Sequence, residues 1–195
     1  MIIVDVKSGQ PSPWHSLQVA AYELAERENA SHLITFDPVK HKYFRGNEEV
    51  PGVSTILRET GRQGTWSSSV PFYAQKGTYV HRAIELDCAG TLDDSTVDEK
   101  VRPYLDAWRD FKRDTDAVIV ATERRVYHPA YNYAGTLDLI ITLPNEGDVI
   151  AALLYLRKTG KYSWRPLPAL AYTEAKAEWM KALTEYHAAK DDLWA

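Results

Sequence analysis

The sequence predicts a mixed α/β (α+β) fold, in which a central curved β-sheet is flanked by helices. Segments with strand-like and helix-like patterns are interspersed along all 195 residues, and there is no internal repeat. A hydrophobic content of 45% and a charged content of 26% are close to those of an average globular protein. This length suits one compact domain, so we expect a single domain over residues 1–195.

The beginning of the chain is expected to contain a strand, a helix and a hairpin. Residues Ile2–Lys7 are mostly apolar and precede a Ser-Gly pair, which is typical of a short strand. Apolar residues at helical spacing predict a helix from about 14 to 27. Residues 33–50 are expected to form a β-hairpin, with one turn at Asp37-Pro38 and a second turn at Gly46-Asn47.

Helices and strands follow one another in the rest of the chain. The expected helices cover about 53–60, 70–89, 95–114 and 173–189, with a polar loop over 62–69. The expected strands cover about 117–127, 133–143, 149–156 and 161–164. We expect the 70–89 helix to break near Lys76-Gly77, and Pro103 to kink the helix after it.

Composition excludes several classes of protein. No apolar run approaches the roughly 18 residues of a membrane helix, and the N-terminus does not resemble a secretory signal. Cys88 is the single cysteine, which excludes an internal disulfide framework and a multi-cysteine zinc site. A net charge of −4 argues against non-specific coating of long nucleic acid but permits a local basic groove. We therefore expect a cytoplasmic protein without a membrane partner.

The segment Asp5-Val6-Lys7 is the first pattern that could carry chemistry. On a strand, Asp5 and Lys7 project from the same face, whereas Val6 points to the other. A carboxylate and an ammonium group in this relation suit a metal ligand beside a cation that orients water. The structural alternative is an ordinary ion pair on an edge strand.

Two further patterns involve groups that could bind a metal ion. Asp138, in the segment Gly135-Thr136-Leu137-Asp138, is a charge within an apolar strand and needs a cation, a metal or hydrogen-bond donors if it is buried. His81 and Glu85 lie one helical turn apart, a common arrangement of metal ligands. Alternatively, Asp138 lies on a solvated face of the sheet, and His81 is a surface or hydrogen-bonded core residue.

Taken together, these patterns resemble the PD-(D/E)XK nuclease superfamily. The resemblance combines GTxD at 135–138, the strand motif around Asp5 and Lys7, GxxxH at 77–81, and Gln18-x-x-x-Tyr22. The RecB-like branch, which includes phage exonucleases, is the most similar, and residues 34–57 also look like the start of its phage members. The resemblance touches most of the chain and implies a restriction-endonuclease-like core.

The resemblance implies a metal centre that uses Mg²⁺ or Mn²⁺. Asp138 and Asp5 would be the bridging carboxylates, and the backbone carbonyl of Val6 would be a further ligand. His81 would complete the ligand set, as in the RecB-like branch, where it makes Mn²⁺ usable beside Mg²⁺.

Other residues would assist the reaction or bind the substrate. Lys7 would position or deprotonate the attacking water, and Glu123 occupies the place of a further acidic residue before the GTxD strand. Gln18 and Tyr22 would touch the DNA backbone or orient Lys7. The alternative for this pair is that Tyr22 packs in the core and Gln18 caps a carbonyl.

The order of the motifs departs from that of the family. Here the Asp5–Lys7 strand and the Gln18–Tyr22 helix form a block over 2–30, ahead of the hairpin region 31–52 and the remainder 53–195. Placing this block after Val149 restores the family order, so the chain has a block transposition. The sequence leaves open whether this order is natural, engineered or an artefact of residue ordering. In any case the Asp5 strand must pair beside the Gly135–Asp138 strand for the resemblance to hold.

The resemblance predicts a metal-dependent deoxyribonuclease, of the phage exonuclease type, that acts in DNA recombination, repair or processing. DNA is the expected partner, and a homo-oligomer or a segment-exchanged dimer is open. The alternatives are a structure-specific endonuclease and a catalytically silent DNA-binding or recombination-accessory protein. Candidate phosphate contacts are Lys40, Lys42, Arg45, Arg58, Arg62, Arg124, Arg125, Lys158 and Lys161, and candidate stacking residues are Trp14, Trp66 and Tyr73.

Overall fold

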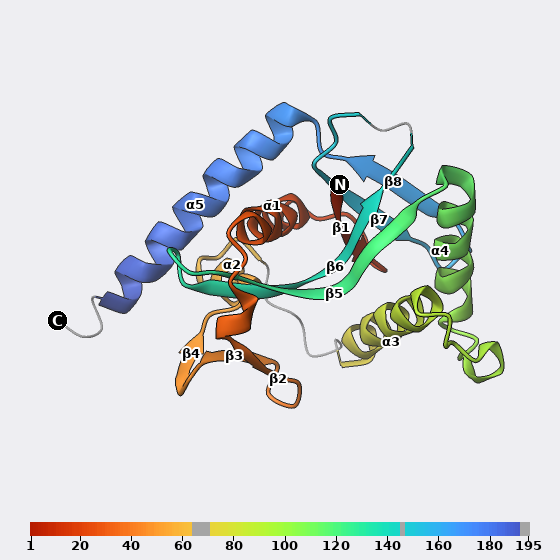
Figure 1. The fold of residues 1–195 in the computed structure, drawn as a ribbon, viewed down its shortest axis with the longest axis horizontal. Helices are drawn as coiled ribbons and strands as arrows, with labels where there is room; N and C mark the ends of the chain where they lie inside the picture. The colour runs from red at the N-terminus through yellow and green to blue at the C-terminus, as the bar shows by residue number, and fades with distance from the viewer. Residues whose placement is uncertain (64–70, 145–146, 192–195) are drawn as a thin grey trace. The chain divides into compact units, whose positions relative to one another are not determined.

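The computed structural model describes residues 1–63, 71–144 and 147–191, with only the backbone of 71–74 and 191 (Figure 1). The chain forms two compact units. The first unit contains Met1–Ser12, Trp66–Arg124 and Asp138–Leu167, and the second contains Pro13–Thr65, Arg125–Leu137 and Pro168–Ala195. The single-domain organisation expected from the sequence stays a prediction. Within the described ranges, no helix combines the length and the apolar character that crossing a bilayer requires.

A mixed five-stranded sheet confirms the predicted fold class. Its strands lie in the order β5-β6-β1-β7-β8, and β1 (Ile2–Lys7) lies between β6 (Tyr133–Thr142) and β7 (Ala151–Leu156). β1 is antiparallel to β6, with Val4 opposite Leu139, and parallel to β7, with Lys7 opposite Tyr155. The N-terminal strand therefore pairs beside the GTxD strand, as the resemblance requires. The outer strands are β5 (Val118–His128) and β8 (Tyr162–Pro166).

One face of this sheet supplies the core of the first unit. Successive side chains of a strand alternate between faces, so Val4 and Val6 point away from Asp5 and Lys7. Two helices pack into the same core, α3 (Pro71–Cys88) and α4 (Arg102–Thr115), and α4 also lies against β7 and β8 (Figure 1). The core residues include Val4, Val6, Leu139, Ile141, Leu154, Leu156, Val80, Ile84, Leu105, Trp108 and Phe111.

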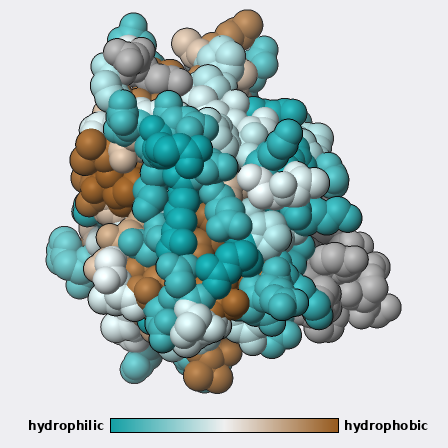
Figure 2. Space-filling view, turned by 90° about the vertical axis from the view of Figure 1, so that its right-hand side faces the viewer, coloured by the Kyte–Doolittle hydropathy of each residue, from teal (hydrophilic) through white to brown (hydrophobic). Residues whose placement is uncertain are grey.

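The outer side of α4 is polar, in contrast to its buried face. Figure 2 views the molecule from the side on which α4 lies in Figure 1, and a continuous hydrophilic band crosses this surface. On α4, Arg113 pairs with Asp110 and Asp114, while Arg109 pairs with Asp87 of α3. The side chains of Trp108 and Phe111 on the same helix are fully buried.

The second unit combines helices with a small antiparallel sheet. Its helices α1 (Trp14–Arg27), α2 (Val53–Glu59) and α5 (Ala169–Asp191) pack against one another. The predicted hairpin with its second turn forms a three-stranded sheet of β2 (Thr35–Asp37), β3 (Lys42–Arg45) and β4 (Glu48–Val50). Gly46 adopts a φ of 62° at the predicted turn, a conformation that costs glycine little. Short 3₁₀ helices cover Ser31–Leu33 in this unit and Asp94–Thr96 in the first.

Two details of the helix prediction are wrong. The α3 helix continues through Gly77, because a single glycine costs a helix only about 1 kcal/mol and the buried residues Val80 and Ile84 hold the next turn in the core. The following helix begins at Arg102 instead of near 95, so Pro103 lies in its first turn and produces no kink. Proline is well tolerated there because its missing N–H would have no helical partner.

Candidate metal centre

Asp138 is held at the point where the pairing of β1 and β6 ends. The register of the two strands runs from Ile2 opposite Ile141 to Val4 opposite Leu139. Beyond this pair, the Asp138 carboxylate accepts a hydrogen bond from the backbone N–H of Val6, with 2.6 Å between Oδ2 and N. The side chain of Asp138 is only 12% exposed. The sequence motifs around Asp5 and Asp138 therefore meet through a direct backbone contact.

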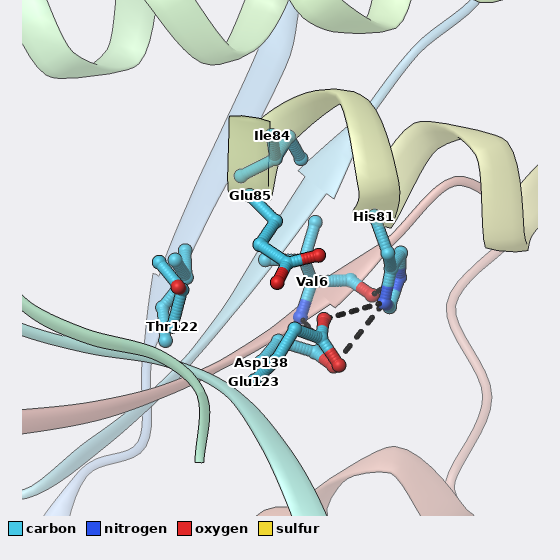
Figure 3. Close-up of a pocket in the computed structure, with 8 residues that line it drawn as sticks. Val6, His81, Ile84, Glu85, Thr122, Glu123 and Asp138 are labelled. Atoms are coloured by element: carbon cyan, nitrogen blue, oxygen red, sulfur yellow. Dashed lines mark hydrogen bonds and ion pairs between the residues drawn. The ribbon is translucent and has the colours of Figure 1, made fainter. Parts of the chain in front are cut away.

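His81 reaches the same point from helix α3 (Figure 3). Its Nδ1 lies 3.3 Å from Oδ1 of Asp138 and 3.7 Å from Oε1 of Glu123, while Nε2 lies 3.2 Å from the carbonyl oxygen of Val6. The buried neighbours Val80 and Ile84 fix this face of the helix in the core of the first unit. The imidazole is thus oriented by two carboxylates and one backbone carbonyl.

Glu123 comes to the site through an unusual backbone conformation in β5. Its φ is 46°, in the left-handed region that non-glycine residues seldom adopt. One ligand atom from each of His81, Glu123 and Asp138 can be chosen so that all three lie within 4.8 Å of one another. Backbone strain of this kind is often found at functional sites. Its presence at a potential ligand is consistent with selection for the position of the carboxylate.

Asp5 and Lys7 form an ion pair beside this cluster. Lys7 Nζ lies 2.8 Å from Oδ1 of Asp5, whose side chain is only 1% exposed. The second carboxylate oxygen of Asp5, Oδ2, is buried and has no hydrogen-bond partner among the residues that the structure describes. A buried acceptor without a partner is costly, and a cation would satisfy it.

The two aspartates of the site have pKa values that are shifted in opposite directions. Burial raises the pKa of Asp5 to about 7, with a further contribution from the charge of Asp138, although Lys7 opposes the shift. Burial would also raise the pKa of Asp138, but the adjacent His81, together with Lys7, lowers it to about 2. Burial disfavours a charged His81, yet Asp138 and Glu123 outweigh it and raise the pKa of the imidazole to about 10. Protonated His81 and Lys7 therefore balance the carboxylates of the protein as it stands.

A pocket opens at the cluster of His81, Glu123 and Asp138, and its lining adds Glu85, which the sequence pairs with His81, and Thr122, which no motif contains. Besides the cluster, Val6, Ile84 and Leu139, it is lined by Glu85 and Thr122 (Figure 3). The Glu85 carboxylate is held by Arg82, with 2.5 Å between Oε2 and Nη1. The helical spacing of His81 and Glu85 indicated a shared face, whereas no local signal pointed to Thr122.

Gln18 and Tyr22 lie on α1, in the second unit, and their predicted role at the site stays a prediction. Gln18 Nε2 donates a hydrogen bond to the hydroxyl oxygen of Tyr22 at 2.8 Å. The Tyr22 ring also packs on Gly135, because a Cβ at residue 135 would lie 2.4 Å from Cε1 of Tyr22. This contact explains why the GTxD segment begins with glycine. It also agrees with the alternative interpretation of Tyr22 as a packing residue.

The predicted contacts to DNA stay predictions. Some of these basic residues form ion pairs within the second unit, such as Lys42 with Glu49 at 2.5 Å and Arg62 with Glu178 at 2.8 Å. Trp66 and the side chain of Tyr73 lie outside the described residues.

The donor set fits a divalent cation. Carboxylate oxygens suit Mg²⁺, and an added imidazole nitrogen also suits Mn²⁺ and other first-row metals. Oδ2 of Asp5 lacks a hydrogen-bond partner among the described residues, and His81, Glu123 and Asp138 offer three further ligand atoms close to one another. These residues can therefore hold an ion, although their chemistry alone does not select one metal.

Comparisons with known proteins add no further identification. No protein-family model matches the chain, and no curated protein matches it significantly.

Proposed function

We propose that this chain is a Mg²⁺- or Mn²⁺-dependent deoxyribonuclease of the RecB-like phage exonuclease type, which hydrolyses phosphodiester bonds in DNA recombination, repair or processing. The observation that carries the proposal is the hydrogen bond from the Val6 N–H to Asp138, which joins two motifs 132 residues apart in the chain. Chance motifs would have no reason to meet. His81 and Glu123 at the same point add support.

The residues of the site suit the hydrolysis of a phosphodiester. His81, Glu123 and Asp138, together with Asp5 and the Val6 carbonyl, would hold a divalent ion, which when bound stabilises negative charge on the phosphoryl group. Lys7 lies beside Asp5 and is 15% exposed, so its ammonium group can orient a water molecule and offset developing charge. The Val6 N–H fixes the orientation of the Asp138 carboxylate.

The test is cleavage of linear duplex DNA with Mg²⁺ or Mn²⁺ and with EDTA. We expect activity only with metal, and a loss of at least about a thousandfold in Asp138→Asn, because the variant loses the charge at the centre of the cluster. Asp110→Asn is the matched control, since Asp110 pairs with Arg113 on the surface of α4. Equal activity of wild type and Asp138→Asn would contradict the proposal, and so would cleavage in EDTA.

Lys7→Gln provides a second variant in case Asp138→Asn does not fold. We expect Lys7→Gln to fold, because the glutamine amide can still donate a hydrogen bond to the buried Asp5, and to lose most of its cleavage. The form of the DNA separates the two kinds of nuclease, because an exonuclease degrades linear DNA but leaves covalently closed circles intact. Cleavage of both forms would instead favour the structure-specific endonuclease.

A further inference from the structure

Two arginines share one tyrosine ring in the first unit. The guanidinium carbons of Arg157 and Arg165 each lie 5.4 Å from the centroid of the Tyr155 ring. Tyr155 is only 1% exposed, whereas Arg165 is exposed and Arg157 is half-buried. The ring therefore holds two cations whose charges remain accessible to solvent.

Neither arginine has an acidic partner among the described residues. Arg157 Nη1 lies 3.3 Å from the carbonyl oxygen of Gly9 and 3.5 Å from Oε1 of Gln10, both of which are uncharged. Among the described residues, Arg165 contacts the ring of Tyr155 and forms no ion pair. Other arginines of this unit pair with aspartates, namely Arg102, Arg109 and Arg113. In a chain with a net charge of −4, two neighbouring arginines without acids require an explanation.

The strand register places this pair on the face of the sheet that carries Asp5 and Lys7. Lys7 lies opposite Tyr155, and Asp5 lies opposite Leu153, which in turn lies opposite Arg165 on β8. Residues that are directly opposite each other project from the same face. Because neighbouring strands are 4.7–4.9 Å apart, the Cα atom of Arg165 is about 10 Å from that of Asp5.

Electrostatics link the arginine pair to the site. Burial raises the pKa of the Tyr155 hydroxyl, and the charges of Arg165, Asp5, Lys7 and Arg157 all act on the same group. Both guanidinium groups place a positive charge beside the same ring, and an anion bound there would be attracted to both charges. A guanidinium fork matches the oxygens of a phosphate in geometry as well as in charge.

We propose that Arg157 and Arg165, held on the ring of Tyr155, form an arginine clamp that binds a backbone phosphate of the DNA strand entering the Asp5–Lys7 site. This inference rests on the proposed function, because it assigns to the same site its contact with a neighbouring nucleotide. The clamp binds the substrate and takes no part in bond cleavage. Its contribution is therefore to affinity and to the position of the strand.

Binding without metal tests the clamp separately from cleavage. The probe is a fluorescently labelled duplex oligonucleotide with a single-stranded overhang, titrated in EDTA at 50 to 200 mM salt and followed by anisotropy. For each of Arg157→Gln and Arg165→Gln we expect roughly a fivefold loss of affinity, and a salt slope that is smaller by about one. Arg165→Lys should recover part of the affinity, since it keeps the charge but loses the planar fork.

Arg113→Gln is the matched control, because it removes the same charge from an acid-paired arginine of the same unit. In cleavage with metal, we expect the clamp variants to raise KM with little change in kcat. If the double variant, which combines Arg157→Gln with Arg165→Gln, binds DNA with the affinity and salt slope of Arg113→Gln, the clamp is refuted. Should the double variant fail to fold, Arg165→Gln alone decides, because this side chain is exposed.

The two proposals can fail independently. Wild-type protein that cleaves DNA while Arg165→Gln behaves as the control would leave the proposed function standing and overturn the clamp. Wild-type protein that binds DNA through the arginines but never cleaves it would support the clamp and overturn the nuclease. Failure of the wild type to bind the oligonucleotide in EDTA at 50 mM salt would overturn the clamp, whereas the proposed function is decided by cleavage in the presence of metal.

Discussion

At the residue scale, Glu123 contributes to the site from a backbone conformation that non-glycine residues disfavour. A left-handed conformation costs a residue with a Cβ about 1–2 kcal/mol relative to the right-handed one. Glu123 adopts a φ of 46° in the middle of a strand, where its carboxylate lies 3.7 Å from His81. The strain places an acid where an ordinary strand residue could not present one. Function and stability are therefore expected to conflict at this residue.

Two substitutions of Glu123 distinguish the stability cost of its backbone conformation from the effect of its carboxylate on metal binding. Glu123→Ala and Glu123→Gly both remove the carboxylate, but only glycine accepts a φ of 46° at little cost. We expect Glu123→Gly to be more stable than Glu123→Ala by about 1 kcal/mol in urea unfolding with EDTA. Both variants should lose the same share of metal affinity in calorimetric titration with Mn²⁺. Equal stabilities would show that the backbone at this position is unstrained.

Several site residues could be predicted from the sequence, whereas others could not. Asp5, His81 and Asp138 stand in recognisable motifs, and the structure places them around one point of the sheet. The contact of Asp138 with the Val6 N–H depends on where two distant strands stop pairing, which no local pattern encodes. The arginine clamp was missed for the same reason, because it requires the register across β1, β7 and β8.

At the scale of elements, periodicity predicted which segments fold but not how they combine. The bounds of β1 and α1 agree with the alternating and helical patterns of their residues. Apolar runs in β1, β6 and β7 do not by themselves specify the order of strands, and the resemblance supplied the pairing of β1 with β6. The start of the helix after Thr96 was misplaced because Pro103 can either kink a helix or begin one.

At the scale of elements, one carboxylate makes several of the polar contacts between α3 and α4. Asp87, at the end of α3, accepts hydrogen bonds from Trp108 Nε1 at 3.0 Å, Arg109 Nε at 2.8 Å and Lys112 Nζ at 2.5 Å. The Asp87 side chain is 9% exposed, so these bonds are largely protected from water. Since His81 lies on the same helix, this junction also supports the position of the imidazole.

Removal of this carboxylate should weaken the whole first unit. We expect Asp87→Ala to lower the free energy of unfolding by about 2–4 kcal/mol, because it leaves a buried indole N–H and two partly buried cations without a partner. Chemical unfolding followed by tryptophan fluorescence measures the change. Asp110→Ala, which breaks an exposed pair with Arg113 on α4, should change stability by less than about 0.5 kcal/mol. A similar effect of the two substitutions would mean that Asp87 does not connect the helices.

At the scale of the whole molecule, the site makes stability depend on pH. The pKa of His81 rises from 6.5 to about 10 on folding, so its stabilisation is complete below pH 6.5 and is lost as the pH rises through 10. The pKa of Asp5 rises from 3.8 to about 7, so its contribution is likewise complete below pH 3.8 and is lost as the pH rises through 7. The pKa of Asp138 falls from 3.8 to about 2, so its contribution is present above pH 3.8 and is lost as the pH falls through 2.

These pKa shifts predict that a rise in pH lowers the stability of the metal-free protein but increases the stabilisation that a bound metal ion provides. Without metal, stabilisation by Asp5 and His81 declines between about pH 4 and pH 10. A divalent ion binds the deprotonated ligands and takes over the role of the protons, so its stabilising effect grows as the pH rises. We therefore expect Mn²⁺ to raise the Tm more at pH 8.5 than at pH 5.5, measured against EDTA by differential scanning fluorimetry.

His81→Gln should reduce the fall of Tm at alkaline pH in EDTA, and it should also reduce the Tm shift caused by Mn²⁺. His32→Gln, at an exposed position, should leave both effects unchanged. A shift with Mn²⁺ that is equal at the two pH values, or that persists in full in His81→Gln, would show that the ion binds elsewhere.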